Sequence, residues 1–136
     1  MPVTARWLDE EKTILGFIYS GSWEWQEAFD MMATSPQMMD EVDHPVAVVV
    51  DMTTGQQLPS DPLKHIPKLS QGRGKSKNDS GITVFLNANI LTKAMQDVIE
   101  MTKMPMPKGL VAVYARTYDD AIEQARIELQ RYKDRQ

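Results

Sequence analysis

Pro45-Val46-Ala47-Val48-Val49-Val50-Asp51 is the stretch that decides the fold of this 136-residue chain. The run is apolar on both alternating faces and ends at an acid. Such a pattern is typical of a strand that is covered on both sides, as the central strand of a parallel sheet is. We therefore expect this segment to lie in the middle of a sheet with helices packed on it.

Strand signals recur along the chain. Predicted strands cover residues 5–10, 13–19, 45–50, 81–86 and 110–114. The first two are separated by a short acidic turn and predict a β-hairpin, whereas the others alternate with helical patterns. This order predicts a single α/β domain over residues 1–136, with a central, mostly parallel or mixed sheet of four or five strands and helices packed on it.

Two helical segments are expected before the central strand. Ser22 is placed to cap a helix that begins at Trp23. At helical spacing only one of Trp23 and Trp25 can face the core, which leaves the other partly exposed. Ser35-Pro36 is typical of a new helix start, so we predict a separate short helix over 36–42.

Three further helices are expected after the central strand. A short amphipathic pattern covers 63–69, and segment 71–80, rich in glycine and lysine, predicts an exposed loop. Asn87 or Asn89 is placed to cap a long helix with a broad apolar face. Thr117 begins a pattern similar to a capping box and predicts the start of a last helix.

Composition excludes several kinds of site. The chain has no Cys, which excludes disulfides, thiolate metal sites and a cysteine nucleophile, and which is compatible with a reducing compartment. Its two histidines are too few for a His-rich metal site. The first residues lack a signal-peptide core, and no window approaches the roughly 20 apolar residues of a membrane span. We expect a soluble, cytoplasmic protein with no cofactor, metal or membrane span.

Charge is distributed unevenly along the chain. Residues 1–61 carry a net charge of −9, residues 62–78 carry +5 with no acid, and the remainder is balanced. The basic segment can form either an anion site or a solvated loop that faces the acidic first third. It contains no aromatic residue on which a base could stack, so we expect no nucleic-acid partner.

Gly72-Arg73-Gly74-Lys75-Ser76 shares its last residues with a phosphate-binding P-loop. The first glycine of that motif would fall at Leu69, and the segment precedes a strand instead of following one. We therefore predict no nucleoside triphosphate site. The same cations and backbone N–H groups can still form a looser anion site.

Candidate catalytic groups are few. Ser60 and His65 are five residues apart, a spacing that defines no geometry for a nucleophile and its base. Asp51 is the best-placed single acid, because open α/β sheets place functional groups at the carboxyl ends of their strands. It can equally end the strand and cap the following loop. We predict no catalytic residue and no enzymatic activity.

The order of elements resembles the STAS fold of bacterial anti-sigma-factor antagonists and sulfate-transporter tails. The central strand running into Asp51-Met52-Thr53 is similar to the family's apolar strand that ends in Asp-Leu-Ser. Leu58-Pro59-Ser60-Asp61-Pro62-Leu63 takes the place of the family segment in which a hydroxyl residue at the start of a helix is phosphorylated. Asp61 stands in the place of that phosphoacceptor, so the resemblance implies a fixed negative charge and no phosphorylation switch.

The resemblance implies a non-enzymatic regulatory module that binds a protein partner. We expect its contact surface in the 53–63 loop and the short basic helix after it. The candidate binding residues are Asp51, Thr53, Thr54, Ser60, Asp61, Lys64, Arg73 and Lys75. The alternative is a small-molecule or lipid-binding protein, or an enzyme, in which the methionine-rich helix around Met95, Met101, Met104 and Met106 forms an adaptable apolar wall with Asp51 and Lys75 at its mouth.

Methionines suggest where such surfaces lie. The adjacent pairs Met31-Met32 and Met38-Met39 cannot all face inward on a helix. A second group is formed by Met95, Met101, Met104 and Met106. An outward methionine, an exposed tryptophan or a free strand edge would offer contacts for a partner or for a homodimer.

Overall fold

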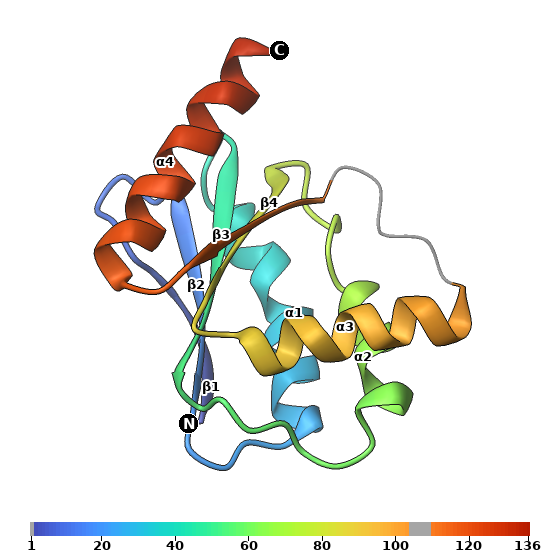
Figure 1. The fold of residues 1–136 in the computed structure, drawn as a ribbon. Coiled ribbons are helices and arrows are strands. Elements are labelled where there is room, and N and C mark those ends of the chain that lie inside the picture. The colour runs from blue at the N-terminus through green and yellow to red at the C-terminus, as the bar shows by residue number, and fades with distance from the viewer. Residues whose placement is uncertain (1, 104–109) are drawn as a thin grey trace.

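The computed structural model describes residues 2–103 and 110–136. Within these ranges it contains a five-stranded sheet and four helices (Figure 1). In chain order the elements are β1 (Val3–Trp7), β2 (Ile14–Ser20), α1 (Trp25–Met39), β3 (Val46–Thr54), α2 (Pro62–Ser70), β4 (Asp79–Leu86), α3 (Asn89–Thr102), β5 (Val111–Ala115) and α4 (Tyr118–Asp134). The predicted α/β class with an N-terminal hairpin is confirmed.

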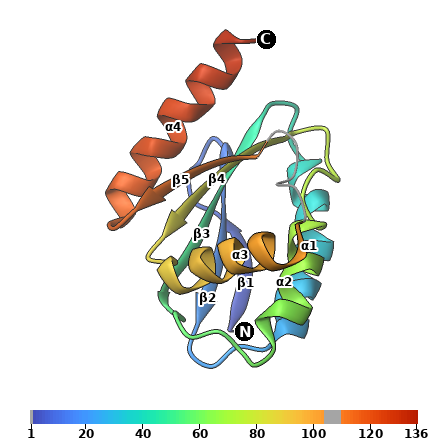
Figure 2. The same cartoon turned by 45° about the vertical axis from the view of Figure 1, so that its right-hand side comes forward.

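The strands lie across the sheet in chain order, β1-β2-β3-β4-β5. β1 and β2 pair antiparallel, whereas β2 to β5 run parallel. Each parallel connection steps one strand in the same direction, so right-handed crossovers place α1, α2 and α3 on one face. α4 follows the last strand and packs on the opposite face, as Figures 1 and 2 show.

β3 lies in the middle of the sheet and is buried on both faces, as predicted. Val48 and Val50 pack beneath α1, α2 and α3, whereas Ala47 and Val49 pack beneath α4. The sheet thus separates two apolar cores. β3 also extends to Thr54, so the prediction that the strand ends before Asp51 is wrong.

The first strand lies earlier than predicted, at Val3–Trp7 instead of 5–10. Residues 8–12 form the turn of the hairpin, and they cannot continue the strand. In this turn the Asp9 carboxylate accepts the backbone N–H of Thr13 at 2.9 Å. The acidic residues that the prediction placed at the end of the first strand therefore belong to the turn.

α1 is one continuous helix, and the prediction of a separate helix over 36–42 is wrong. Pro36 has no N–H to donate to the carbonyl of Met32, four residues earlier. The buried Ser35 hydroxyl donates to that carbonyl instead, at 3.2 Å. Serine thus replaces the hydrogen bond that proline removes, and the helix continues to Met39.

α1 is capped by Glu24, so the predicted cap at Ser22 is wrong. The Glu27 carboxylate accepts the backbone N–H of Glu24 at 2.9 Å, as in a capping box. Trp23 precedes the helix and is not bound by helical spacing, so it and Trp25 are both buried. The expectation that one of these tryptophans is exposed is therefore wrong, and neither offers a contact for a homodimer.

Segment 71–80 is not the exposed loop that was predicted, because three of its polar residues are buried: Ser76, Asn78 and Ser80. The Asn78 amide donates to the carbonyls of Met39 and Val42, at 2.9 and 2.7 Å. Polar groups are tolerated in a core when they are hydrogen-bonded. This segment is thereby joined to the end of α1.

Of the N-caps predicted for the last two helices, one is confirmed and one is wrong. The Thr117 hydroxyl accepts the N–H of Asp120 at 3.1 Å, which confirms the predicted start of α4. The N-cap position of α3 is Ala88, whose side chain makes no capping hydrogen bond, so the predicted cap at Asn87 or Asn89 is wrong. Asn87 has a φ of 53°, outside the extended region that an N-cap usually adopts.

The methionine pairs of α1 are largely covered. Met31 and Met39 are buried, and the outward members, Met32 and Met38, are half-buried. Met101 on α3 is 68% exposed and is the methionine that reaches the surface most fully among those described. Met104 and Met106 lie outside the described residues.

Candidate functional site

β2 and β3 end at the same edge of the sheet, which we call the carboxyl edge. It forms the lower part of the molecule in Figure 1, where residues 21–24 lead to α1 and loop 55–61 leads to α2. The two connections touch, because the N–H of Gly21 donates to the carbonyl of Thr54 at 2.7 Å. Open α/β sheets present their functional groups at this edge.

Two buried indoles hold loop 55–61 from beneath. The Nε1–H of Trp23 donates to the carbonyl of Gly55 at 3.1 Å, and that of Trp25 donates to the carbonyl of Ser60 at 2.7 Å. The two rings also pack edge to face, with centroids 5.1 Å apart. Both ends of the loop are thus fixed by side chains that the core itself holds in place.

Gly55 lets this loop approach β2 closely. A Cβ at this position would lie 2.7 Å from the backbone carbon and oxygen of Tyr19. Backbone atoms cannot yield as the end of a flexible side chain can. The loop keeps its path only with glycine here.

The outer side of the loop is polar and exposed. The exposed residues at the end of β3 and in the loop are Thr53, Thr54, Gln56, Gln57, Ser60 and Asp61. All of these except Asp61 line an open hollow of about 760 Å³, together with residues 21–24 and Ile90. Of the predicted binding residues, the structure therefore brings Thr53, Thr54 and Ser60 together at the hollow, whereas Asp51 and Asp61 do not line it.

Two exposed apolar side chains lie on one side of α3, with the exposed acid Asp97 between them. Ile90 and Met101 lie eleven residues apart, on the same side of the helix, and are 49% and 68% exposed. Leu63 of α2, 46% exposed, lines a shallow groove together with Met101. We define the edge surface as the exposed side chains of Gln56, Gln57, Ser60, Leu63, Ile90 and Met101.

Asp51 serves the local backbone. Its Oδ1 accepts the N–H of Thr53 at 2.9 Å, as an acid does when it caps a turn. The Thr53 hydroxyl accepts the amide of Asn87 at 3.0 Å. These contacts join the ends of β3 and β4 and leave Asp51 half-buried.

Asp61 precedes α2, and Pro62 occupies its first turn. The carboxylate of Asp61, however, does not cap the helix. Its backbone is left-handed, with φ 63° and ψ 51°, and its carbonyl accepts the N–H groups of Lys64 and His65 at 3.1 and 3.3 Å. The carboxylate of Asp61 and the side chain of Lys64 therefore face solvent.

Arg73 and Lys75 lie near the start of β4, at the opposite end of the strands from the carboxyl edge. The Nε and Nη2 groups of Arg73 donate to both oxygens of Asp79, at 2.8 and 2.6 Å. The N–H groups of Gly74 and Gly81 donate to the same carboxylate, at 3.0 and 2.9 Å. Arg73 is thus paired within the fold, whereas Lys75 is exposed.

The Asp79 carboxyl is ionised in this setting. Burial raises its pKa, but the hydrogen bonds and the charge of Arg73, with the N–H groups of Gly74 and Gly81, together outweigh that effect. The pKa of Asp79 is therefore held below its ordinary value. The pair forms a charged link between segment 73–74 and β4.

One cavity agrees in part with the alternative prediction of a methionine-lined pocket, because Met95 lines it. A cavity of about 80 Å³ beneath α1, α2 and α3 is lined by Met32 and Met95. Asp51 and Lys75 do not line it. Its polar groups come instead from Arg73 and Thr83.

Comparisons of the chain with protein-family models, with curated proteins and with solved structures find no match. Within residues 2–103 and 110–136, no group of three or more His, Asp or Glu side chains is arranged to hold a metal ion. None of the helices in those ranges combines the length and the apolar character that a membrane crossing requires. The resemblance to STAS domains thus rests on element order and on the two quoted segments.

The sequence patterns did not identify the residues that shape this edge, namely Trp23, Trp25, Gly55 and Ile90. The sequence does show two tryptophans separated by one residue near a helix start, and a glycine in a polar loop. Their roles depend on contacts across 32 and 35 residues, which periodicity does not report.

Proposed function

We propose that this chain is a non-enzymatic regulatory module of the cytoplasm that binds a protein partner through the edge surface. The observation that carries this proposal is the pair of indole hydrogen bonds beneath loop 55–61. A loop that is ordered before binding loses little conformational entropy when a partner docks. Its exposed side chains can therefore contribute directly to affinity.

The chemistry of the edge surface supports a protein partner. Leu63, Ile90 and Met101 offer exposed apolar contacts, and glutamine and serine side chains surround the hollow. Apolar anchors with a polar rim are typical of protein interfaces. The hollow is open and lined mainly by polar residues, whereas small-molecule sites are enclosed and mostly apolar.

The resemblance to STAS domains favours the same surface. In that family the phosphorylated residue lies at the start of the helix that α2 corresponds to, and Asp61 presents an exposed carboxylate there. We propose that this fixed charge takes the place of the phosphate. Intact-mass measurement of protein from its native host should then show no stoichiometric phosphate. A full phosphate on Ser60 or Thr53 would contradict this.

Ile90→Ser tests the surface directly, because it removes an exposed apolar contact beside the hollow. Ile127→Ser is the matched control, since Ile127 is 38% exposed on α4, across the sheet. The wild type and both variants are used to capture proteins from the source cell, and each captured protein is purified and titrated against all three.

We expect one protein that binds the wild type and Ile127→Ser equally, and Ile90→Ser about tenfold more weakly. Failure to find any purified binder contradicts the proposal. So does a binder whose affinity is equal for the two variants.

A further inference from the structure

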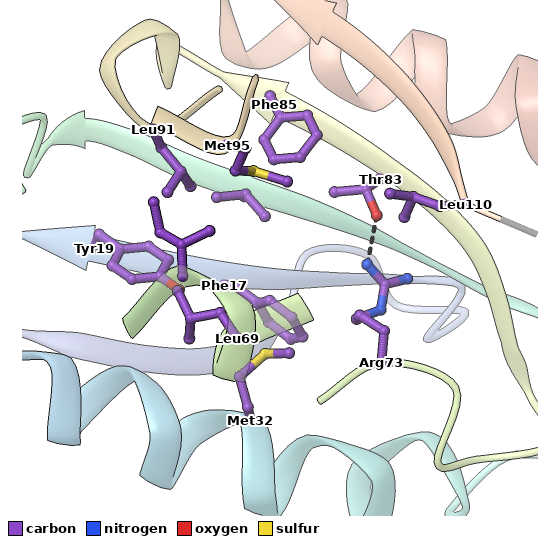
Figure 3. Close-up of a pocket in the computed structure, with 12 residues that line it drawn as sticks. Phe17, Tyr19, Met32, Leu69, Arg73, Thr83, Phe85, Leu91, Met95 and Leu110 are labelled. Atoms are coloured by element: carbon purple, nitrogen blue, oxygen red, sulfur yellow. Dashed lines mark hydrogen bonds between the residues drawn. The ribbon is translucent and has the colours of Figure 1, made fainter. Parts of the chain in front are cut away.

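A small cavity lies between the sheet and α1, α2 and α3 (Figure 3). Its wall is almost entirely apolar and includes Phe17, Val50 and Phe85 from the strands and Met32, Leu69 and Met95 from the helices. None of its lining residues belongs to the edge surface. The cavity is therefore a separate site from the edge surface.

Two polar side chains meet at one end of this cavity. Arg73 Nη1 donates to the hydroxyl of Thr83, which is buried, as Figure 3 shows. A guanidinium has five N–H donors, and Thr83 and Asp79 together engage three of those of Arg73. Two N–H groups remain, and the hydroxyl hydrogen of Thr83 has no acceptor among the described residues.

The charge balance at this end selects the kind of ligand. Asp79 already compensates Arg73, at 2.6 Å. A carboxylate would add a net negative charge to a largely buried site, and an ammonium group would face Arg73, so both are costly. A carbonyl or ether oxygen can accept the remaining hydrogens without changing the charge.

Tyr19 lies at the other end of the cavity from Arg73 (Figure 3). It is 3% exposed, and its hydroxyl makes no hydrogen bond within the described residues. Burial raises the pKa of this phenol, so it stays a neutral O–H donor. The donors that an oxygen in this cavity can meet are therefore those of Arg73 and Thr83.

The volume, about 80 Å³, limits the size of an occupant. An apolar cavity of roughly 150 Å³ accommodates benzene in another protein, so this one suits a smaller group. Met32 and Met95 are flexible and can yield to a slightly larger one. The site fits a compact molecule, or the end of a chain, with only a few carbon atoms.

We propose that this cavity binds a small neutral molecule, or a chain end, that carries a carbonyl or ether oxygen on a short apolar body. The oxygen accepts hydrogen bonds at the Arg73–Thr83 end, and the apolar part contacts Phe17, Met32 and Met95. Carboxylates and amines of the same size are excluded by charge.

Three probes of equal heavy-atom count test this: 2-butanone, propanoate and butylammonium. Each is titrated at pH 7 into protein labelled with ¹³C at the methionine methyl groups. Met32 and Met95 report on the cavity, and the exposed Met101 is the internal reference. Saturable shifts of Met32 and Met95 with 2-butanone are expected, with propanoate and butylammonium at least tenfold weaker.

Leu69→Phe fills the cavity, and Leu63→Phe makes the same change on the exposed side of the same helix. Binding of 2-butanone is lost in the first variant and kept in the second, with melting temperatures measured for both. If Leu69→Phe does not fold, Val50→Ile, which adds a methylene at the cavity wall, gives the same readout. The inference is overturned if 2-butanone causes no shift, if the three probes bind equally, or if binding survives in the filled variant. These outcomes concern the cavity alone, and the proposed partner surface is tested separately by Ile90→Ser.

Discussion

Replacing Trp25 with Phe removes the indole N–H that holds the carbonyl of Ser60 and keeps an aromatic ring in the core. Trp25 is only 6% exposed, so the lost ring atoms leave a cavity that costs about 1–2 kcal/mol. The hydrogen bond, 2.7 Å long, adds about 1 kcal/mol. We expect Trp25→Phe to lower the free energy of unfolding by about 2–3 kcal/mol.

Trp7→Phe is the matched control, because it removes the same atoms without breaking a hydrogen bond. The indole N–H of Trp7 is buried and has no partner among the described residues. Its removal relieves an unpaired donor, which offsets part of the lost packing. We expect a loss below about 1 kcal/mol, measured for both variants by urea denaturation with far-UV circular dichroism.

Amide hydrogen exchange places the effect in the structure. Residues 55–61 should exchange about tenfold faster in Trp25→Phe and at the wild-type rate in Trp7→Phe. The reasoning is refuted if the two variants lose the same stability and the loop exchanges alike in both, because the indole bond would then not hold the loop.

Three other changes probe the fold. Asp79→Asn should lower the free energy of unfolding by about 3 kcal/mol at pH 7. Glu128→Gln, in a 2.9 Å pair whose Arg131 side chain is 65% exposed, should lower it by less than about 0.5 kcal/mol; equal losses in urea denaturation would contradict the buried pairing of Asp79. Because the pKa of Asp79 is lowered by folding, its contribution is present above the unfolded value of about 3.9 and is lost as the pH falls below it. The gap in melting temperature between the wild type and Asp79→Asn should therefore be constant above about pH 5 and shrink below about pH 4; a constant gap throughout would exclude this linkage. Ser35→Ala leaves the carbonyl of Met32 without its donor and should cost about 1 kcal/mol in urea denaturation, and no cost would show that the hydroxyl does not support the helix. Gly55→Ala places a Cβ 2.7 Å from the backbone of β2 and should cost more than about 2 kcal/mol, whereas an unchanged melting temperature would show that the loop can move away.

The fold class could be predicted because the signals that carry it are local. Segment 45–50 is apolar on both faces, and only a strand between two layers of helices uses such a run. The alternation of strands and helices then leaves few topologies, since right-handed crossovers fix the side of each helix. Sequence periodicity was sufficient for these features.

The continuation of α1 through Pro36 could not be predicted from the same rules. Ser-Pro is a good helix start, and the local preference favoured a break. The outcome depends on whether the Ser35 hydroxyl turns back to Met32, which is a side-chain choice within the folded helix. Two local rules compete at this position, and packing in the core decides between them.

The net charge of a segment does not reveal the role of Arg73. The basic segment 62–78 contains no acid, but the counter-ion of Arg73 is Asp79, which directly follows that segment. A net charge over a window therefore suggested a free cation where the fold contains a neutral pair. The pairing of Arg73 with Asp79 depends on the shape of the turn between them, and the composition of the segment does not describe that shape.

Site-specific photo-cross-linking tests the proposed partner surface most directly. A photoreactive amino acid replaces Gln56, in the exposed loop, or Gln130, an exposed glutamine of α4 across the sheet. After irradiation in the source cell, position 56 should yield one discrete adduct heavier than the chain, which mass spectrometry identifies as a single protein, and position 130 should yield none. No adduct from position 56, or the same adducts from both positions, would contradict the proposal that the carboxyl edge binds a protein partner.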